Sequence, residues 1–105
     1  METSGSLTVR VTTNGFLLLG EIDSSTADLL AEHLQSRNTT AGDLTVDMQG
    51  IQFIDSTGLR VLVEAHQVAE NRGDRLLIER PSAVVSRLLD VSGLAEYLHV
   101  VDFVD

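Results

Sequence analysis

Residues 46–66 read VDMQGIQFIDSTGLRVLVEAH, and this stretch decides the fold of the chain. Its first part is an apolar run typical of a buried strand, and from Leu59 onward apolar residues recur at helical spacing. Between them lies Asp55-Ser56-Thr57-Gly58. A small hydroxyl residue at a strand-to-helix junction either caps the helix with its oxygen or stands exposed at the positive helix end. We therefore place the candidate functional site at Ser56.

The segment before this stretch predicts an antiparallel pair of strands. Residues 1–6 are small and polar, so we expect a flexible start without regular structure. Residues 7–12 alternate between apolar and polar side chains, as in a strand with one exposed face. Asn14-Gly15 is a strong hairpin signal, and the more apolar residues 16–22 form the returning strand.

A helix is expected next, because residues 23–26 (DSST) are all of types that cap helices well. Ser25 and Asp28 have the spacing of a capping box, and the helix should end near Arg37. Residues 44–48 (LTVDM) form the next strand. Since a helix connects it to the preceding strand, a right-handed crossover to a parallel neighbour is the expected connection.

The remainder of the chain repeats the alternation of helix and strand. Gly73 is well placed for a left-handed end to the helix that starts at Ser56, and residues 76–78 (LLI) form a strand. A third helix begins at Pro81-Ser82 and ends at Gly93, and residues 99–104 form a last short edge strand. The inward-facing residues expected in the third helix are Val84, Val85, Leu88 and Leu89.

This order predicts an α/β fold in a single domain over residues 1–105. The sheet should be mixed but mostly parallel, with the hairpin at its antiparallel edge and helices packed against it. Chains of this size bury roughly two-thirds of their surface on folding, so the hydrophobic content of 43% is ample for a core.

Composition excludes several classes of function. The chain has no cysteine, so it has no disulfide, thiolate metal site or thiol nucleophile. Its formal net charge of −9 argues against binding a nucleic-acid backbone, which requires clustered Lys and Arg. No signal peptide and no membrane-length apolar run are evident, so we expect a cytoplasmic protein.

Two acids stand beside the candidate serine in this prediction. Asp23 and Asp55 both follow predicted strands, and parallel strands bring their carboxyl ends to the binding edge of an open sheet. Each carboxylate either complements a helix N-terminus or shares one surface patch with Ser56. A hydrolase nucleophile elbow is excluded because Ile54, not glycine, lies two residues before the serine. His66, on an apolar helix face, is interpreted as packed and hydrogen-bonded, and His33 and His99 as surface residues.

Four motifs together resemble the STAS domain of bacterial anti-anti-sigma factors, over about residues 7–101. They are Gly20-Glu21-Ile22-Asp23 with Thr26-Ala27, then Asp55-Ser56-Thr57-Gly58-Leu59, then Arg72-Gly73-Asp74-Arg75-Leu76, and finally residues 85–94 (VSRLLDVSGL). The resemblance implies a sheet of four or five strands with the helices on one side. It also implies a regulator that is not an enzyme and has no cofactor or metal.

The resemblance further implies a partner switch in transcription regulation and stress response. In such proteins the unphosphorylated form binds an anti-sigma factor that is also a serine kinase, which frees the sigma factor. Phosphorylation of the motif serine ends the binding, and a phosphatase restores it. Carried onto this chain, the phosphoacceptor is Ser56, with Thr57 as the neighbouring hydroxyl. The partner-binding residues implied are Asp23, Asp55, Ser56, Thr57, Gly58 and Arg60, of which Arg60 replaces a residue that is small in many relatives.

Two other functions remain open at this point. One is a nucleotide-binding or weakly catalytic domain that holds a phosphate with Asp23, Asp55 and Ser56. The other is a scaffold subunit of a larger sensory assembly, where similar domains occur.

Overall fold

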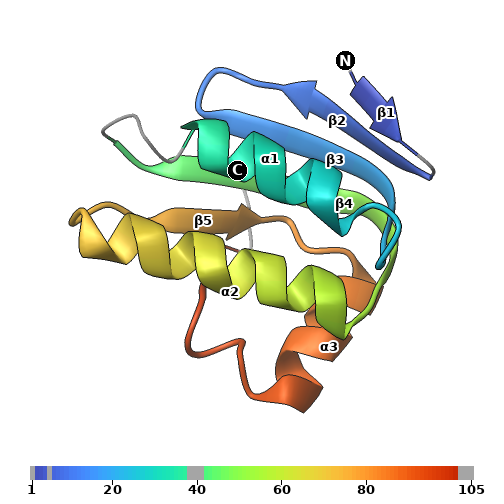
Figure 1. Cartoon of the computed structure of the whole chain (residues 1–105). Coiled ribbons are helices and arrows are strands. Elements are labelled where there is room, and N and C mark those ends of the chain that lie inside the picture. Colours follow the sequence, from blue (N-terminus) through green and yellow to red (C-terminus); the bar gives the residue numbers. More distant parts are fainter. Residues whose placement is uncertain (1, 5, 38–41, 102–105) are drawn as a thin grey trace.

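The computed structural model describes residues 2–4, 6–37 and 42–101, and it shows one sheet with three helices (Figure 1). The strands are β1 (Glu2–Ser4), β2 (Leu7–Val11), β3 (Gly15–Ile22), β4 (Leu44–Ile54), β5 (Leu76–Glu79) and β6 (His99–Val101). The helices are α1 (Ala27–Arg37), α2 (Ser56–Asn71) and α3 (Ala83–Ser92). The strands follow the sheet in chain order from β1 to β6.

The expected α/β class and mixed sheet are confirmed. The pairs β1–β2 and β2–β3 are antiparallel, whereas β3, β4, β5 and β6 run parallel to one another. The sheet has six strands rather than four or five because Glu2–Ser4, expected to lack regular structure, pairs with β2. An edge strand held by backbone hydrogen bonds needs no apolar pattern, so the sequence carried no signal for it. The expected final strand is confirmed for His99–Val101, and its continuation over 102–104 lies outside the described residues.

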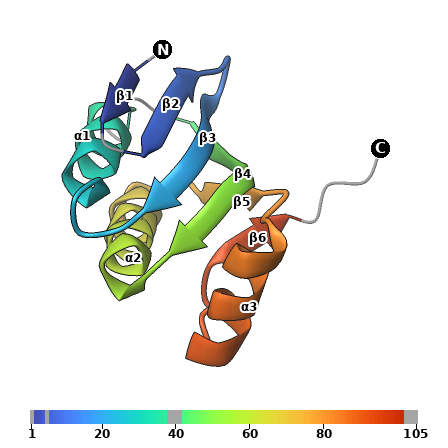
Figure 2. The same cartoon turned by 90° about the vertical axis from the view of Figure 1, so that its right-hand side faces the viewer.

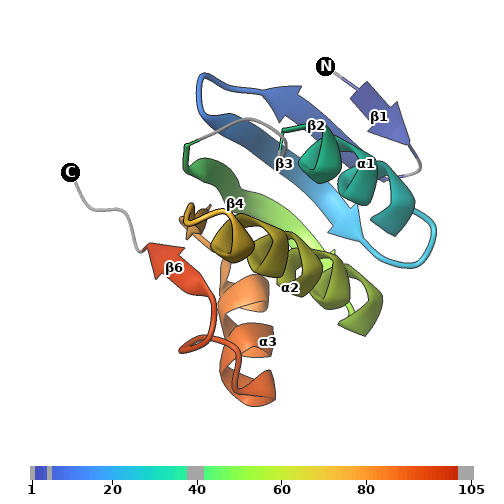
Figure 3. The same ribbon diagram turned by 60° about the vertical axis from the view of Figure 1, so that its left-hand side comes forward.

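Helices α1 and α2 lie side by side against one face of the sheet (Figures 2 and 3). Helix α3 lies beside the second half of β4, because β5 pairs only with the first four residues of that strand. The backbone N–H of Ser82, which caps α3, donates to the carbonyl of Met48 in β4. The core between the layers consists mainly of Leu7, Val9, Phe16, Leu18, Ile22, Leu30, Leu34, Val46, Met48, Ile51, Leu62, Ala69, Leu76, Ile78, Val85 and Leu89.

The C-terminal ends of α2 and α3 follow the sequence signals, but one side chain of α3 points in another direction than expected. Gly73 and Gly93 both have the left-handed conformation expected after a helix, with φ of 80° and 77°. In α3, Val85 and Leu89 are buried as expected. The expectation that Val84 points inward is wrong, because its side chain is 39% exposed. Successive residues of a helix are turned by about 100°, so Val84 lies to the side of the stripe that Val85 and Leu89 bury.

The parallel pairing of β3 and β4 brings two strand-to-helix junctions together. Ile22, the last residue of β3, lies in register with Ile54, the last residue of β4. The backbone N–H of Asp55 donates to the carbonyl of Ile22 at 3.2 Å, so the two junctions are joined directly. The N-termini of α1 and α2 therefore lie at the same end of the sheet (Figure 3).

Candidate functional site

The junction before α1 is held by Asp23 and Thr26. The Asp23 backbone N–H donates to Thr26 Oγ1 at 2.9 Å, and the Asp23 Oδ1 accepts from the N–H and hydroxyl of Ser25. The expected capping box of Ser25 and Asp28 is therefore wrong, since a similar reciprocal arrangement forms two residues earlier. Thr26 is fully buried and its hydroxyl also donates to the carbonyl of Glu21. The hydrogen bonds from Ser25, with smaller contributions from Thr26, hold the pKa of Asp23 below its usual value.

The junction before α2 is capped by Asp55. Its Oδ1 accepts from the backbone N–H groups of Thr57 at 3.0 Å and Gly58 at 3.1 Å. The interpretation of Ser56 as the helix cap is therefore wrong, because the preceding carboxylate takes that role and Ser56 is the first helical residue. Ser56 is exposed, and within the described ranges its hydroxyl makes no hydrogen bond. The free serine oxygen thus stands at the start of the helix, beside a carboxylate.

Gly58 and Arg60 are placed quite differently from each other. Gly58 is buried, and a Cβ on it would lie 2.5 Å from Cγ2 of Ile22 and 3.1 Å from Cγ1 of Ile54. Its role is to let α2 start close against the ends of β3 and β4, and it offers no surface to a partner. Arg60 is exposed one turn into the helix.

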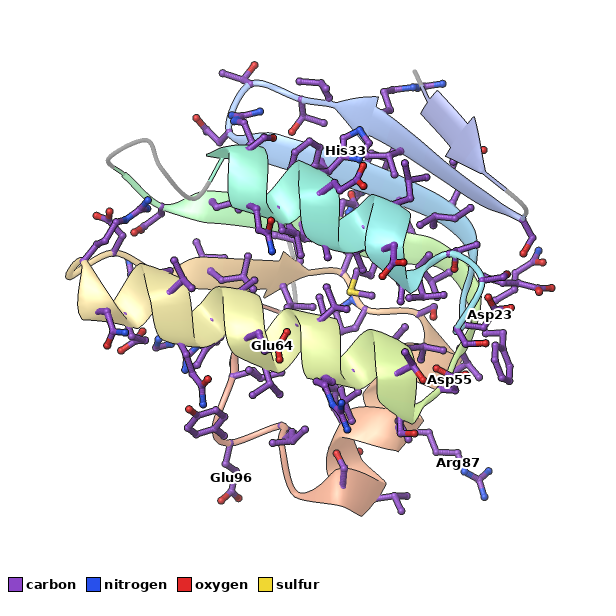
Figure 4. All side chains as sticks on the ribbon, in the orientation of Figure 1. Asp23, His33, Asp55, Glu64, Arg87 and Glu96 are labelled. Carbon is purple, nitrogen blue, oxygen red and sulfur yellow. The ribbon has the colours of Figure 1, made fainter. Side chains whose placement is uncertain are left out.

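One end of the sheet carries most of the predicted site residues. Asp23 and Asp55 lie there on the two adjoining junctions (Figure 4). We call the exposed or half-exposed residues Asp23, Phe53, Asp55, Ser56 and Thr57 the strand-end surface. Phe53 is not among the site residues predicted from the sequence, but its side chain is 45% exposed next to the buried Ile54. The sequence signal for this exposure was the alternation of side chains along a strand, because only one of two successive residues can face the core.

The cap at Asp55 supports the first testable prediction. We expect Asp55→Ala to lower the free energy of unfolding by about 1 kcal/mol, because two helix N–H groups lose their acceptor. The change should be visible in urea unfolding followed by circular dichroism. Ser56→Ala is the matched control at the next residue, and we expect it to change the free energy by less than about 0.5 kcal/mol. Equal losses in the two variants would contradict the assignment of the cap.

Comparison with known proteins fits this geometry. The "Mlab, STAS domain" family matches residues 15–102 of the chain. This chain belongs to the STAS domain family. The Anti-sigma-B factor antagonist of Bacillus subtilis is 31% identical to this STAS domain over 83 residues, which span 79% of the chain and 76% of the relative.

Solved structures show the same fold. The anti-sigma factor antagonist SpoIIAA in its unphosphorylated form superimposes with a TM-score of 0.73 at 16% identity, covering 92% of this chain and 89% of that one. The Bacillus cell fate determinant SpoIIAA in the phosphorylated form gives 0.67 at 16% identity, covering 92% of each chain. No helix in the part of this STAS domain that the structure describes has the length and apolar character needed to cross a membrane.

The histidines of this STAS domain lie away from the strand-end surface. His33 and His99, expected at the surface, are both half-buried: His33 packs edge-on against Phe16, and His99 pairs with Glu70. His66 is buried as expected. The expectation that it is hydrogen-bonded is wrong for Nδ1, which among the described residues is a buried side-chain nitrogen without a hydrogen-bond partner.

Proposed function

We propose that this STAS domain is an anti-sigma factor antagonist whose binding is controlled by phosphorylation at Ser56. In its unphosphorylated form it binds an anti-sigma factor that is also a serine kinase, and the sigma factor is released. Phosphorylation of Ser56 by that kinase ends the binding, and a phosphatase restores it. The names of the curated relatives support the anti-sigma factor as partner.

The observation that carries the proposal is the position of the Ser56 hydroxyl. It is exposed at the first residue of α2, and it makes no hydrogen bond within the described ranges. A kinase can therefore reach the oxygen without unfolding the helix. Substitution or modification of an exposed side chain at this position removes no packing, so the fold should persist when a phosphate is attached.

The charges around Ser56 explain why phosphorylation should weaken partner binding. A phosphate adds about −1.5 to −2 charges at neutral pH. The N–H groups of Thr57 and Gly58 are not free to receive it, because they already donate to Asp55. The phosphate is thus added beside one carboxylate and near a second, that of Asp23. A partner surface that accommodates these two acids meets a large excess of negative charge after phosphorylation.

Phe53 supplies the apolar part of the proposed contact. Large aromatic side chains at the centre of an interface contribute much of the binding free energy. The exposed ring of Phe53 lies two residues before the capping carboxylate, at the end of β4. The strand-end surface then combines one aromatic anchor with a phosphorylatable hydroxyl, so a single covalent change controls the whole contact.

A phosphorylation assay tests this function. The protein is incubated with ATP and candidate anti-sigma kinases, and its intact mass is measured, with peptide mapping of any modified product. We expect one added phosphate on Ser56, none in Ser56→Ala, and unchanged modification in Thr57→Ala as the control for the neighbouring hydroxyl. Modification of Thr57 instead, or no modification of folded protein by any candidate kinase, would contradict the proposal and favour a scaffold role.

A further inference from the structure

Three side chains that bind metals well converge where the second half of α2 meets the start of β6. His66 and Glu70 are four residues apart on α2, so they lie on the same helix face. His99 is the first residue of β6, and its Nε2 lies 2.7 Å from Oε2 of Glu70. One possible ligand atom from each of the three residues lies within 4.8 Å of the other two.

The buried member of this group carries an unused polar atom. His66 is 4% exposed, and its Nδ1 has no hydrogen-bond partner in the described residues. The His66 ring contacts the rings of Tyr97 and His99, with ring centroids 4.7 Å and 5.3 Å away. A buried polar atom without a hydrogen-bond partner lowers the stability of the fold. The burial of this imidazole nitrogen therefore calls for an explanation.

We propose that His66, Glu70 and His99 form a binding site for a divalent transition metal of the Zn²⁺ class. Two imidazole nitrogens and one carboxylate oxygen are an established donor set for zinc with one coordination position left open. In a tetrahedral site with bonds of about 2.0–2.1 Å, ligand atoms lie about 3.4 Å apart. Here Nε2 of His99 lies 2.7 Å from Oε2 of Glu70, and one ligand atom from each residue lies within 4.8 Å of the others. Small rotations of the half-exposed Glu70 and His99 side chains bring them to that spacing around a fixed His66.

The metal takes the place of the hydrogen bond between Glu70 and His99 and joins two parts of the chain that are 29 residues apart. It fastens the edge strand β6 to α2. The exposed sides of Glu70 and His99 leave room for water or a partner's side chain in the fourth position. The site lies about 15 Å along α2 from Ser56, so it is separate from the strand-end surface and does not depend on the proposed function.

Calorimetric titration of the intact protein with ZnCl₂ tests the site. We expect saturable binding of one Zn²⁺ to the wild type. His99→Gln and Glu70→Gln each remove one ligand from a half-exposed position, so both variants should fold. Their affinity should fall by at least about tenfold, because even the loss of a group that only supports a ligand costs about 10–100-fold. Glu64→Gln, an exposed acid on the same helix, and His33→Gln, a histidine on α1, are the matched controls and should bind as the wild type does.

Absorption spectroscopy with Co²⁺ gives a second measurement that does not depend on stability. Coordination by the three residues should produce visible bands in the wild type and in Glu64→Gln, and these bands should be lost in His99→Gln. The proposal is overturned if the wild type shows no saturable binding of one metal ion. It is also overturned if the Zn²⁺ affinity of His99→Gln or Glu70→Gln falls by less than tenfold. The ion would then be held by the overall negative charge of the protein and not by these ligands.

Discussion

A Ser56→Asp variant is expected to bind the anti-sigma factor at least about tenfold more weakly than Ser56→Ala, a difference of about 1.4 kcal/mol. The new carboxylate stands beside Asp55, which caps α2, and near Asp23 on the adjoining junction. Covering this third carboxylate with a partner surface costs desolvation free energy and repulsion from the two neighbouring acids, so the partner loses affinity. Titration calorimetry with the purified anti-sigma factor measures the effect.

Two measurements separate this charge effect from damage to the fold. An acid in the first turn of a helix is favourable by a few tenths of a kcal/mol, so Ser56→Asp should unfold at the same urea concentration as the wild type or slightly above it. Thr12→Asp adds the same charge at the exposed turn between β2 and β3, at the opposite end of β3 from Asp23. It should leave partner binding unchanged. Equal binding by Ser56→Asp and Ser56→Ala would refute the charge switch.

Gly20→Ala is expected to be strongly destabilising, lowering the free energy of unfolding by about 2–5 kcal/mol. Gly20 has φ of 110°, a conformation that side chains rarely adopt. A Cβ there would also lie 1.8 Å from the carbonyl oxygen of Ser6. That oxygen accepts a hydrogen bond from the N–H of Glu21, so it cannot move away without breaking the contact between β2 and β3. Urea unfolding measures the loss.

Gly42→Ala is the matched control, because Gly42 has the same φ of 110° but no atom of the described residues would lie within 4 Å of a Cβ there. It carries the conformational cost alone, about 1–3 kcal/mol. Gly20→Ala should therefore exceed Gly42→Ala by about 1–3 kcal/mol, which is the cost of the steric clash. Similar losses in the two variants would show that the close approach of Ser6 is relieved at no cost.

The sequence by itself determined the elements whose signals are local. The hairpin between β2 and β3, the left-handed ends at Gly73 and Gly93, and the alternation of helices and strands after β3 all depend on residues within a few positions of each other. Parallel pairing then follows from general rules of connection, and it places Asp23 and Asp55 at one end of the sheet. The position of Ser56 at the start of α2 could be predicted for the same reason.

Only the tertiary structure decided the features that depend on contacts between distant residues. Whether Asp55 or Ser56 caps α2 is settled by the side chain that reaches the free N–H groups, since both residue types cap well. The exposure of Phe53, the contact that requires glycine at position 20, and the meeting of His66 with His99 all arise from register and packing. A sequence pattern reports the face on which a residue lies. It does not report which residue of another element comes to face it, because that is fixed only when the layers pack together.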